Sequence, residues 1–591
     1  MKKLILFYLL IITTIVSAQL RPIIIDGKFS DWNQFSPAYT DTLNGQVSGN
    51  IDFHSLWISN NNIYLLFRIE VGGEINLQND NSITLYIDTD NNLSTGKKID
   101  GIGAELEYTF GARSGIFHSA NGDITIYHNN IGLISAPTVT STQFEIGIRR
   151  NAVIQNIPLF KSDTIEVVFK DNGVGQDMLP DRSGGVRYVF EKHNFSPLPG
   201  YSIKKLNNNY LRIMTNNVRK DDFFNASLYT HYKDEYSAIA PDIIGFEEIY
   251  KHTAAETVNR VAGILPLTGG AKWYGAKSNS DVAVVSKFPI IKVFPIDGNA
   301  AFLINLRPKY NTDLLFISAH PPCCNNNDGR QKEIDHIMAF IRNAKDSTGS
   351  LALPVNTPII IAGDMNLVGY AQQLKTFLTG DIVDTNSFGP DFKPGWDGSN
   401  FKDSDPIDAG YPADFTWYSA NSPYSPGKLD YIIYSGSVLK KMNGYVLFTK
   451  GMNPDTLKAY GLKPDDSIDA SDHIPVVTDF KLLSVATSVN NSSGSILPEH
   501  IKLDQNYPNP FNPTTTIRFS LKESSKVTLN VYNLLGQKVA TLINEDMSSG
   551  YKTVDFNATN LASGVYLYRL AVTGISDGAS YINTKKMILL K

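Results

Sequence analysis

The stretch 358–366, PIIIAGDMN, places an aspartate and an asparagine at the end of an apolar run. An unbroken apolar run that ends on glycine and polar residues is typical of a buried β-strand with a polar tip. A polar side chain at the end of a buried strand is held rigidly, as a preorganised site requires. Asp364 and Asn366 are therefore candidates for chemistry.

The same pattern recurs through residues 205–485, where apolar strands alternate with the helical segments 229–240 and 329–345 and indicate layered α and β elements. For a single strand tip, a turn or a helix cap is the simpler interpretation. Several tips of the same kind favour one shared site. The other tips carry carboxylate, amide or imidazole groups: Asn216, Asn217, Glu247, Glu248, His320, Asp430, Asp472 and His473.

The residue types at these tips indicate a chemistry. Carboxylates and amides are hard oxygen ligands that suit Mg²⁺, Mn²⁺ or Ca²⁺. Imidazoles beside such an ion can move protons or bind a developing oxyanion. The sequence has neither a G-x-S-x-G nucleophile motif nor a P-loop. The set therefore favours metal-assisted attack of water on a phosphate ester.

The ordered segments TNNV, GFEE, SDVAVVSKFPI, FISAHPP, IAGDMN, FTW, KLDYIIYS and SDHIPV resemble the endonuclease/exonuclease/phosphatase superfamily, whose fold is that of deoxyribonuclease I. The resemblance implies a four-layer αββα sandwich with a divalent metal at the sheet edge. It implies hydrolysis of a phosphodiester, in a nucleic acid or a phospholipid head group. Nuclease, sphingomyelinase-like and phosphatase branches share this core and differ in their loops, so the substrate stays open.

The resemblance also implies a role for each matching residue. The metal ligands would be Asn217, Glu248 and Asp472. Five residues would be catalytic. Asp364 would orient or deprotonate water, Asn366 would contact the phosphate, and His473 would stabilise the phosphate or protonate the leaving oxygen. Asp430 would orient His473, and His320 would be the second histidine of the deoxyribonuclease branch. Glu247 stands where the family usually has glutamine.

Composition limits the other interpretations of the chain. Of its 591 residues 42% are hydrophobic and 19% are charged, and the formal net charge is −5, which fits a globular, multidomain protein without a general basic surface. The alternative to an enzyme is a non-catalytic carbohydrate-binding or adhesion protein that keeps the fold. The only cysteines, Cys323 and Cys324, are adjacent, so they form either a vicinal disulfide or two free thiols.

Residues 19–195 predict a β-sandwich, because short alternating strands are separated by Asn, Gly and Asp turns. IIIDGKFSDW, NNIYLLFRIE and LYIDTDNNLSTG resemble family 9 carbohydrate-binding modules and DOMON-like sandwiches, which implies a glycan partner. Asp88, Asp90 and Asn92 alternate oxygen ligands, as in a calcium loop. The competing interpretation is a turn that hydrogen-bonds its own backbone.

The two ends of the chain predict export. Residues 1–18 have the charged start, apolar middle and small-residue exit of a signal peptide. After a Ser/Asn-rich linker, 486–500, residues 501–591 predict a small β-sandwich. NPFNP, YNLLGQKV and GVYLYRL resemble the type A sorting domain of type IX secretion substrates. The protein is expected to pass through the periplasm to the type IX machinery, to be secreted or attached to the cell surface, and to have no transmembrane segment.

Overall fold

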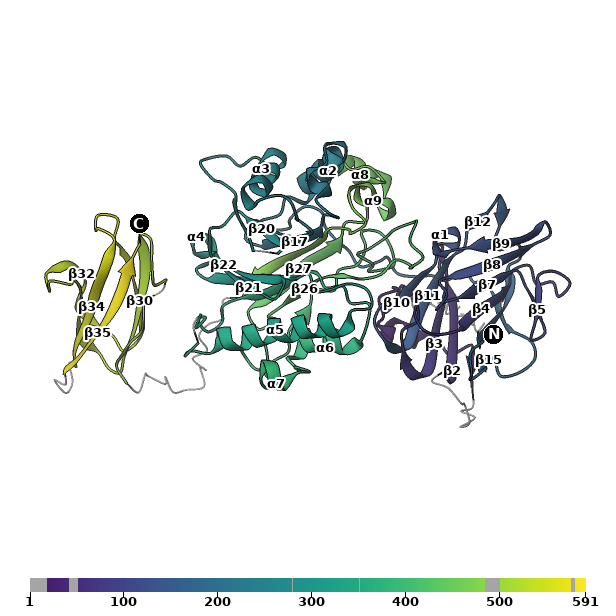
Figure 1. The fold of residues 1–591 in the computed structure, drawn as a ribbon, viewed down its shortest axis with the longest axis horizontal. Coiled ribbons are helices and arrows are strands. Elements are labelled where there is room, and N and C mark those ends of the chain that lie inside the picture. Colours follow the sequence, from purple (N-terminus) through teal and green to yellow (C-terminus); the bar gives the residue numbers. More distant parts are fainter. Residues whose placement is uncertain are drawn as a thin grey trace, which may run out of the picture. The chain divides into compact units, whose positions relative to one another are not determined.

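The computed structural model describes residues 19–41, 51–278, 280–349, 351–483, 500–506, 508–574 and 580–590. They form two compact units that divide between Ser484 and Val485. The first unit contains a strand-rich N-terminal region and a central region of strands and helices, so the expected multidomain, strand-rich chain is confirmed (Figure 1). The predicted signal peptide, 1–18, and all but the last residue of the predicted linker, 486–500, lie outside the described residues.

The N-terminal region has two large sheets. One is five-stranded, in the order β1 (Tyr39–Thr40), β2 (Phe53–Asn60), β3 (Tyr64–Ile75), β11 (Ser141–Arg149), β10 (Ile134–Ala136). The other is seven-stranded, in the order β15 (Met178–Leu179), β14 (Thr164–Asp171), β4 (Ile83–Asp88), β7 (Leu106–Thr109), β8 (Ser114–Ser119), β9 (Gly122–Ile126), with β16 (Val186–Val189) also on β14. The smaller elements are η1 (Phe29–Gln34), β5 (Lys97–Ile99), β6 (Ile102–Ala104), α1 (His128–Ile131), β12 (Val153–Ile154) and β13 (Ile157–Pro158).

The two N-terminal sheets pack face to face. Phe67 on β3 and Phe169 on β14 are fully buried, and their ring centroids lie 5.6 Å apart. Trp32 and Trp57 are buried as well. Neither tryptophan therefore offers an exposed ring on which a sugar could stack.

The central region is built on two six-stranded sheets. The first has the order β19 (Tyr274–Lys277), β20 (Ala283–Ser286), β18 (Ile243–Glu247), β17 (Leu211–Asn217), β28 (Val476–Leu482), β27 (Leu439–Val446). The second has the order β21 (Ile290–Ile296), β22 (Asn299–Asn305), β23 (Asp313–Ser318), β24 (Ile359–Asp364), β26 (Asp430–Tyr434), β25 (Lys402–Asp403).

Helices cover the outer faces of both sheets (Figure 1). On the first sheet these are α2 (Tyr229–Ile239), α3 (Ala254–Ile264), α8 (Pro454–Tyr460) and α9 (Asp466–Ala470), with η2 (Asp222–Phe224), η3 (Ala226–Leu228) and η4 (Thr449–Gly451) nearby. On the second they are α5 (Asn327–Lys345), α6 (Ala371–Thr379) and α7 (Thr385–Phe388), while α4 (Arg307–Tyr310) connects β22 to β23. The two helices expected from the sequence are confirmed as α2 and α5.

Strand pleating lets each central sheet pack against the other sheet on one face and against helices on the other. On β17, Ile213 belongs to the cluster between the sheets, whereas the next residue, Met214, packs with Tyr236 of α2 and Val261 of α3. Successive strand residues point to opposite faces, so a run that is apolar at every position fits a strand that is buried on both sides. This is why the apolar strands carry chemistry only at their tips.

The N-terminal region packs directly on the central region. Trp57 and Tyr64 share one buried cluster with Tyr411 and Phe415. The Tyr64 and Tyr411 hydroxyls hydrogen-bond to each other, and Arg149 donates to Tyr411 at 3.0 Å. The two regions are thus joined by an apolar core with a polar network at its centre.

The second unit contains two antiparallel sheets that share an apolar core. The three-stranded sheet has the order β29 (Lys502–Leu503), β30 (Thr514–Leu521), β33 (Gly550–Asn557). The four-stranded sheet has the order β32 (Lys538–Met547), β31 (Ser525–Asn533), β34 (Gly564–Gly574), β35 (Ser580–Leu589).

Candidate active site

The tip of β24 lies between the two central sheets and carries Asp364, which is 2% exposed. Gly363 allows this placement, because its φ is 145° and a Cβ atom there would come within 2.0 Å of the Ala319 carbonyl oxygen. His320 follows Ala319, so the close backbone approach brings His320 beside Asp364. The Nε2 atoms of His320 and His473 lie 3.5 and 3.6 Å from the same oxygen, Asp364 Oδ2. One carboxylate oxygen is therefore flanked by two imidazoles.

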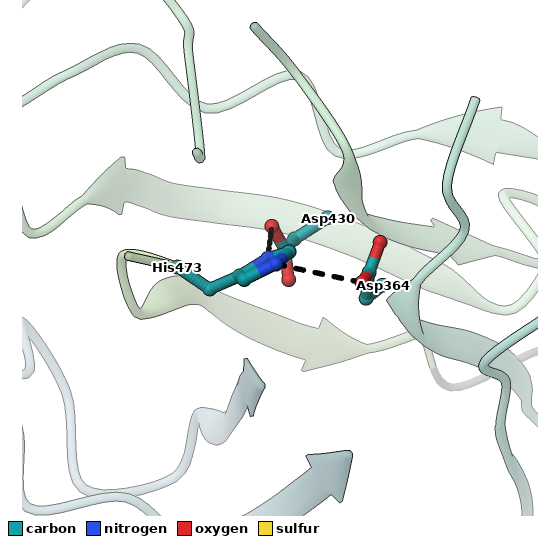
Figure 2. A group of neighbouring side chains, drawn as sticks. All are labelled: Asp364, Asp430 and His473. Carbon is teal, nitrogen blue, oxygen red and sulfur yellow. Dashed lines mark hydrogen bonds and ion pairs between the residues drawn. The ribbon is translucent and has the colours of Figure 1, made fainter. Parts of the chain in front are cut away.

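His473 forms a buried pair with Asp430. Its Nδ1 lies 2.9 Å from Asp430 Oδ2, and its other ring nitrogen faces Asp364 (Figure 2). Thr416 donates to the same Asp430 oxygen at 2.7 Å. Burial alone would lower the pKa of His473, but the carboxylates of Asp430 and Asp364 outweigh it and raise the pKa to about 10. The ring is consequently protonated at neutral pH.

His320 forms a second pair of the same kind, with Asp281. Its Nδ1 lies 2.6 Å from Asp281 Oδ2. Burial opposes protonation of His320, but the hydrogen bond to Asp281 and the charge of Asp364 raise its pKa to about 9. The pKa of Asp281 is lowered, because the hydrogen bond from His320 outweighs burial. Asp281 escaped the sequence prediction, although it precedes an apolar strand just as Asp430 does.

Asn217 links the tips of the two sheets. Its side-chain nitrogen donates to Glu248 Oε1 at 3.2 Å and to Asp364 Oδ2 at 3.1 Å. Glu248 adopts a left-handed backbone conformation with φ of 63°, which is uncommon for glutamate and is often found at functional sites. The amide of Asn366 donates to Asp364 Oδ2 at 3.3 Å and to the Pro321 carbonyl at 3.1 Å. Asn217, Glu248, Asp364 and Asn366 thus lie together at the strand tips.

Asp472 hydrogen-bonds to Trp417 rather than to Asp364 or the residues around it. The Trp417 indole donates to its Oδ2 at 3.3 Å, and its Oδ1 is buried without a hydrogen-bond partner among the described residues. A buried carboxylate oxygen without a partner is costly unless a donor or a cation satisfies it. Asp472 therefore retains one oxygen for a further ligand.

The predicted ligand types fit a hard divalent cation. Asn217, Glu248 and Asp472 offer oxygen atoms, and the orphaned Asp472 oxygen has no competing donor among the described residues. The structure also brings Asp364, Asp430 and His473 together, with one ligand atom from each within 4.8 Å of the others. The site therefore contains acidic groups that could hold a metal ion.

Glu247, the departure from the resembled family, is fully buried at the end of β18. Thr215 donates to its carboxylate at 3.1 Å, as does Ser318. Burial, reinforced by Asp430, raises the pKa of Glu247 well above its ordinary value. A protonated Glu247 is neutral, like the glutamine that it replaces.

Four of the five predicted catalytic residues, all except Asp430, line a cavity of about 950 Å³. His320, Asp364, Asn366 and His473 line it together with Glu248. Cys323 and Cys324 also line the cavity, and both are free thiols. A vicinal disulfide is thus not formed in this structure.

The acidic turn of the N-terminal region brings a further carboxylate to the predicted residues. Asp88, Asp90 and Glu105 each offer a ligand atom within 4.8 Å of the others. The backbone of Asn92 donates to Asp88 Oδ1 at 3.2 Å, as an Asx turn would. Glu105 is distant from the turn in sequence, so local spacing could not identify it.

The facing sheets, with the histidine-flanked carboxylate at their edge, form a phosphoesterase-like fold. Residues 217–473 match the model of the Endonuclease/Exonuclease/phosphatase family, and residues 505–589 match that of the Secretion system C-terminal sorting domain. Both resemblances seen in the sequence are confirmed, whereas the likeness of the N-terminal region to carbohydrate-binding modules stays a prediction. The sorting domain indicates secretion or cell-surface attachment by the type IX route. No described helix is long and apolar enough to cross a membrane.

Several solved structures are similar to the chain. ANGEL2, a 2′,3′-cyclic phosphatase, is 18% identical with a TM-score of 0.30, and the match covers 46% of this chain and 96% of that one. Sphingomyelinase C from Streptomyces griseocarneus is 16% identical with a TM-score of 0.26, covering 46% and 99%. The AP endonuclease LMAP from Leishmania major is 12% identical with a TM-score of 0.25, covering 46% and 88%. No curated protein matches the chain.

Proposed function

We propose that the central region, arranged as a four-layer αββα sandwich, hydrolyses a phosphodiester with the help of a divalent cation. One observation carries the proposal: a single oxygen, Asp364 Oδ2, lies within 3.6 Å of the Nε2 atoms of both His320 and His473. This arrangement can hold a water molecule against a carboxylate and supply protons on either side of it.

Each residue near Asp364 has a separate task in this proposal. Asp364 orients the attacking water and accepts its proton. His473, kept protonated by Asp430, donates a proton to the leaving oxygen. His320, held by Asp281, neutralises negative charge that develops on the phosphate.

The cation would be held by Asn217, Glu248 and Asp472, and Mg²⁺ suits their oxygen atoms best, with Mn²⁺ or Ca²⁺ as alternatives. When bound, a divalent cation supplies positive charge that polarises the phosphate oxygens. Glu248 and Asn217 are already joined by a hydrogen bond of 3.2 Å, so these two groups need little reorganisation to bind it. Asn366 would hydrogen-bond the phosphate.

Removal of divalent cations is expected to abolish hydrolysis of bis-p-nitrophenyl phosphate, because the unneutralised phosphate charge would oppose attack by the hydroxide that forms as Asp364 accepts the proton of the water. The rate of p-nitrophenolate release is measured in Mg²⁺, in excess EDTA, and after Mg²⁺ is restored. We expect a loss of about 100-fold or more in EDTA, with recovery on addition of Mg²⁺. Hydrolysis that is indifferent to EDTA would contradict the metal-dependent mechanism.

We propose a separate calcium site at Asp88, Asp90 and Glu105. Asp88 and Glu105 are each 2% exposed, and Glu105 Oε1 is buried without a hydrogen-bond partner among the described residues. Across the described parts of the chain, none of the three carboxylates forms an ion pair. Three clustered carboxylates without a positive partner would destabilise the fold unless a cation neutralises them.

Calcium is therefore expected to raise the melting temperature of the protein by about 5 °C or more when its concentration is 100 times Kd. The Glu105→Gln variant should lose this shift, as followed by thermal denaturation in Ca²⁺ and in EGTA. Glu107→Gln is the matched control, because Glu107 lies two residues after Glu105, on β7, but pairs with Lys97 at 2.7 Å. An equal shift in both variants would rule out this site.

A further inference from the structure

The N-terminal region forms one wall of the catalytic cavity. Glu74, Asn76, Asp80 and Thr140 line the same cavity as His320, Asp364 and His473. The first four lie far from the catalytic residues in the sequence. The cavity is therefore completed only when the N-terminal and central regions pack together.

This wall is fixed to the chain that follows Asn366. The Thr138 hydroxyl donates to the Leu367 carbonyl at 2.8 Å, and Asn76 donates to the Val368 carbonyl at 2.9 Å. The backbone nitrogen of Thr140 donates to the Gly369 carbonyl at 2.8 Å. Consecutive residues after a proposed phosphate ligand are thus held by the N-terminal wall, so wall and catalytic groups keep a fixed spacing.

The charge of the cavity is unfavourable for polyanions. The wall contributes two carboxylates, Glu74 and Asp80, and none of its described lining residues is Lys or Arg. Among all the described residues that line the cavity, Lys220 is the only Lys or Arg. A protein that binds a polynucleotide neutralises several phosphates with Lys or Arg. This cavity offers one such side chain beyond the catalytic groups.

The cavity instead favours an uncharged ring system. Tyr250 and Tyr370 line it and are 52% and 50% exposed, whereas the ring of Tyr424, which also lines it, lies under the Arg113 guanidinium, 4.4 Å from the ring centroid. Exposed tyrosine rings give flat apolar surface with a polar hydroxyl, which suits stacking on a ring that carries hydroxyl groups. The Tyr424 hydroxyl donates to Asn79 of the wall at 3.4 Å, so this ring also belongs to the boundary between the two regions.

We infer that the N-terminal wall determines substrate specificity. Glu74 and Asp80 restrict the site to esters with a single phosphate group. The alcohol part of such an ester bears a ring and carries no second phosphate. The inference rests on the proposed phosphodiesterase function. Glu74 and Asp80 act as specificity-determining residues and take no part in bond cleavage. They repel a second phosphate that would lie beside the N-terminal region.

The test compares two esters that differ by one phosphate: the p-nitrophenyl ester of thymidine 5′-phosphate, and the same ester with an added 3′-phosphate. We expect the full-length protein with Mg²⁺ to show a kcat/KM about tenfold or more higher for the first ester. The double variant Glu74→Gln, Asp80→Asn removes both charges. The amide oxygen introduced by Glu74→Gln would still accept the hydrogen bond from Thr140, and asparagine tolerates the left-handed φ of 55° at position 80.

At low ionic strength the double variant should lower the ratio of the two kcat/KM values by about three- to tenfold relative to wild type. This difference between the double variant and wild type should vanish in 1 M salt, where the screening length is about 3 Å. Asp163→Asn is the matched control, since Asp163 is exposed in the N-terminal region but outside the cavity lining. Equal rates for both esters in the wild type, or an unchanged preference in the double variant, would overturn the inference. If neither ester is cleaved while bis-p-nitrophenyl phosphate is, the inference fails alone, whereas if none of the three is cleaved the proposed function fails as well.

Discussion

Replacement of His473 with alanine is expected to lower kcat for bis-p-nitrophenyl phosphate by about 10³-fold. The imidazole is 7% exposed, bonded to Asp430 at 2.9 Å, and held in its protonated form. Its loss removes both the proton donor for the leaving oxygen and a positive charge beside Asp364. The turnover number is measured with saturating Mg²⁺, so that a change in kcat is separated from weaker metal binding.

His231→Ala is the matched control for this prediction. His231 also forms an aspartate pair in the central region, with its Nδ1 2.8 Å from Asp466 Oδ1, but it does not line the catalytic cavity. This variant should keep kcat within about threefold of wild type, because neither His231 nor Asp466 lines the catalytic cavity. A His473→Ala protein that retains full activity, with normal thermal stability, would remove His473 from the mechanism.

The strand tips of the central region could be predicted because their signal is local. In 358–366 an apolar strand and its polar tip are adjacent, so the periodicity alone places Asp364 and Asn366 at a sheet edge. Parallel pairing then brings tips together: β17 runs parallel to β18, and β23 to β24. Because parallel strands end at the same edge, Asn217 and Glu247 lie side by side at one end of the first sheet, and Asp364 lies near His320 at one end of the second. The packing of the two sheets then brings these two sets of tips together.

The partners that lie far away in sequence could not be predicted in the same way. Asp281 was part of a matching motif, but its bond to His320 depends on how two different sheets face each other. Glu105 reaches Asp88 through the pairing of β4 with β7, so local spacing could not identify it, and Asn92 as a ligand stays a prediction. The N-terminal wall of the cavity depends on how the N-terminal and central regions pack together, and no periodic pattern in the sequence indicates that packing.

The Asp364→Asn substitution should have the largest effect on catalysis, a loss in kcat on the order of 10⁴-fold. Asp364 Oδ2 receives hydrogen bonds from Asn217 and Asn366 and faces both histidines, so this one atom contacts two amides and two imidazoles of the proposed site. An amide of the same size fills the space but removes the negative charge and the proton acceptor.

The same variant has an effect that does not require turnover. Because the charge of Asp364 helps to raise the pKa values of His320 and His473, both should fall in Asp364→Asn, as measured by NMR titration of the imidazoles in metal-free protein. Asp313→Asn is the control: Asp313 is a buried aspartate that pairs with Arg307 at 2.7 Å, at the start of β23 and thus at the opposite edge of the sheet. It should lower stability and leave kcat within about threefold of wild type. Unchanged imidazole pKa values in Asp364→Asn would show that the two histidines do not sense this carboxylate, whereas unchanged kcat would show that water is activated elsewhere.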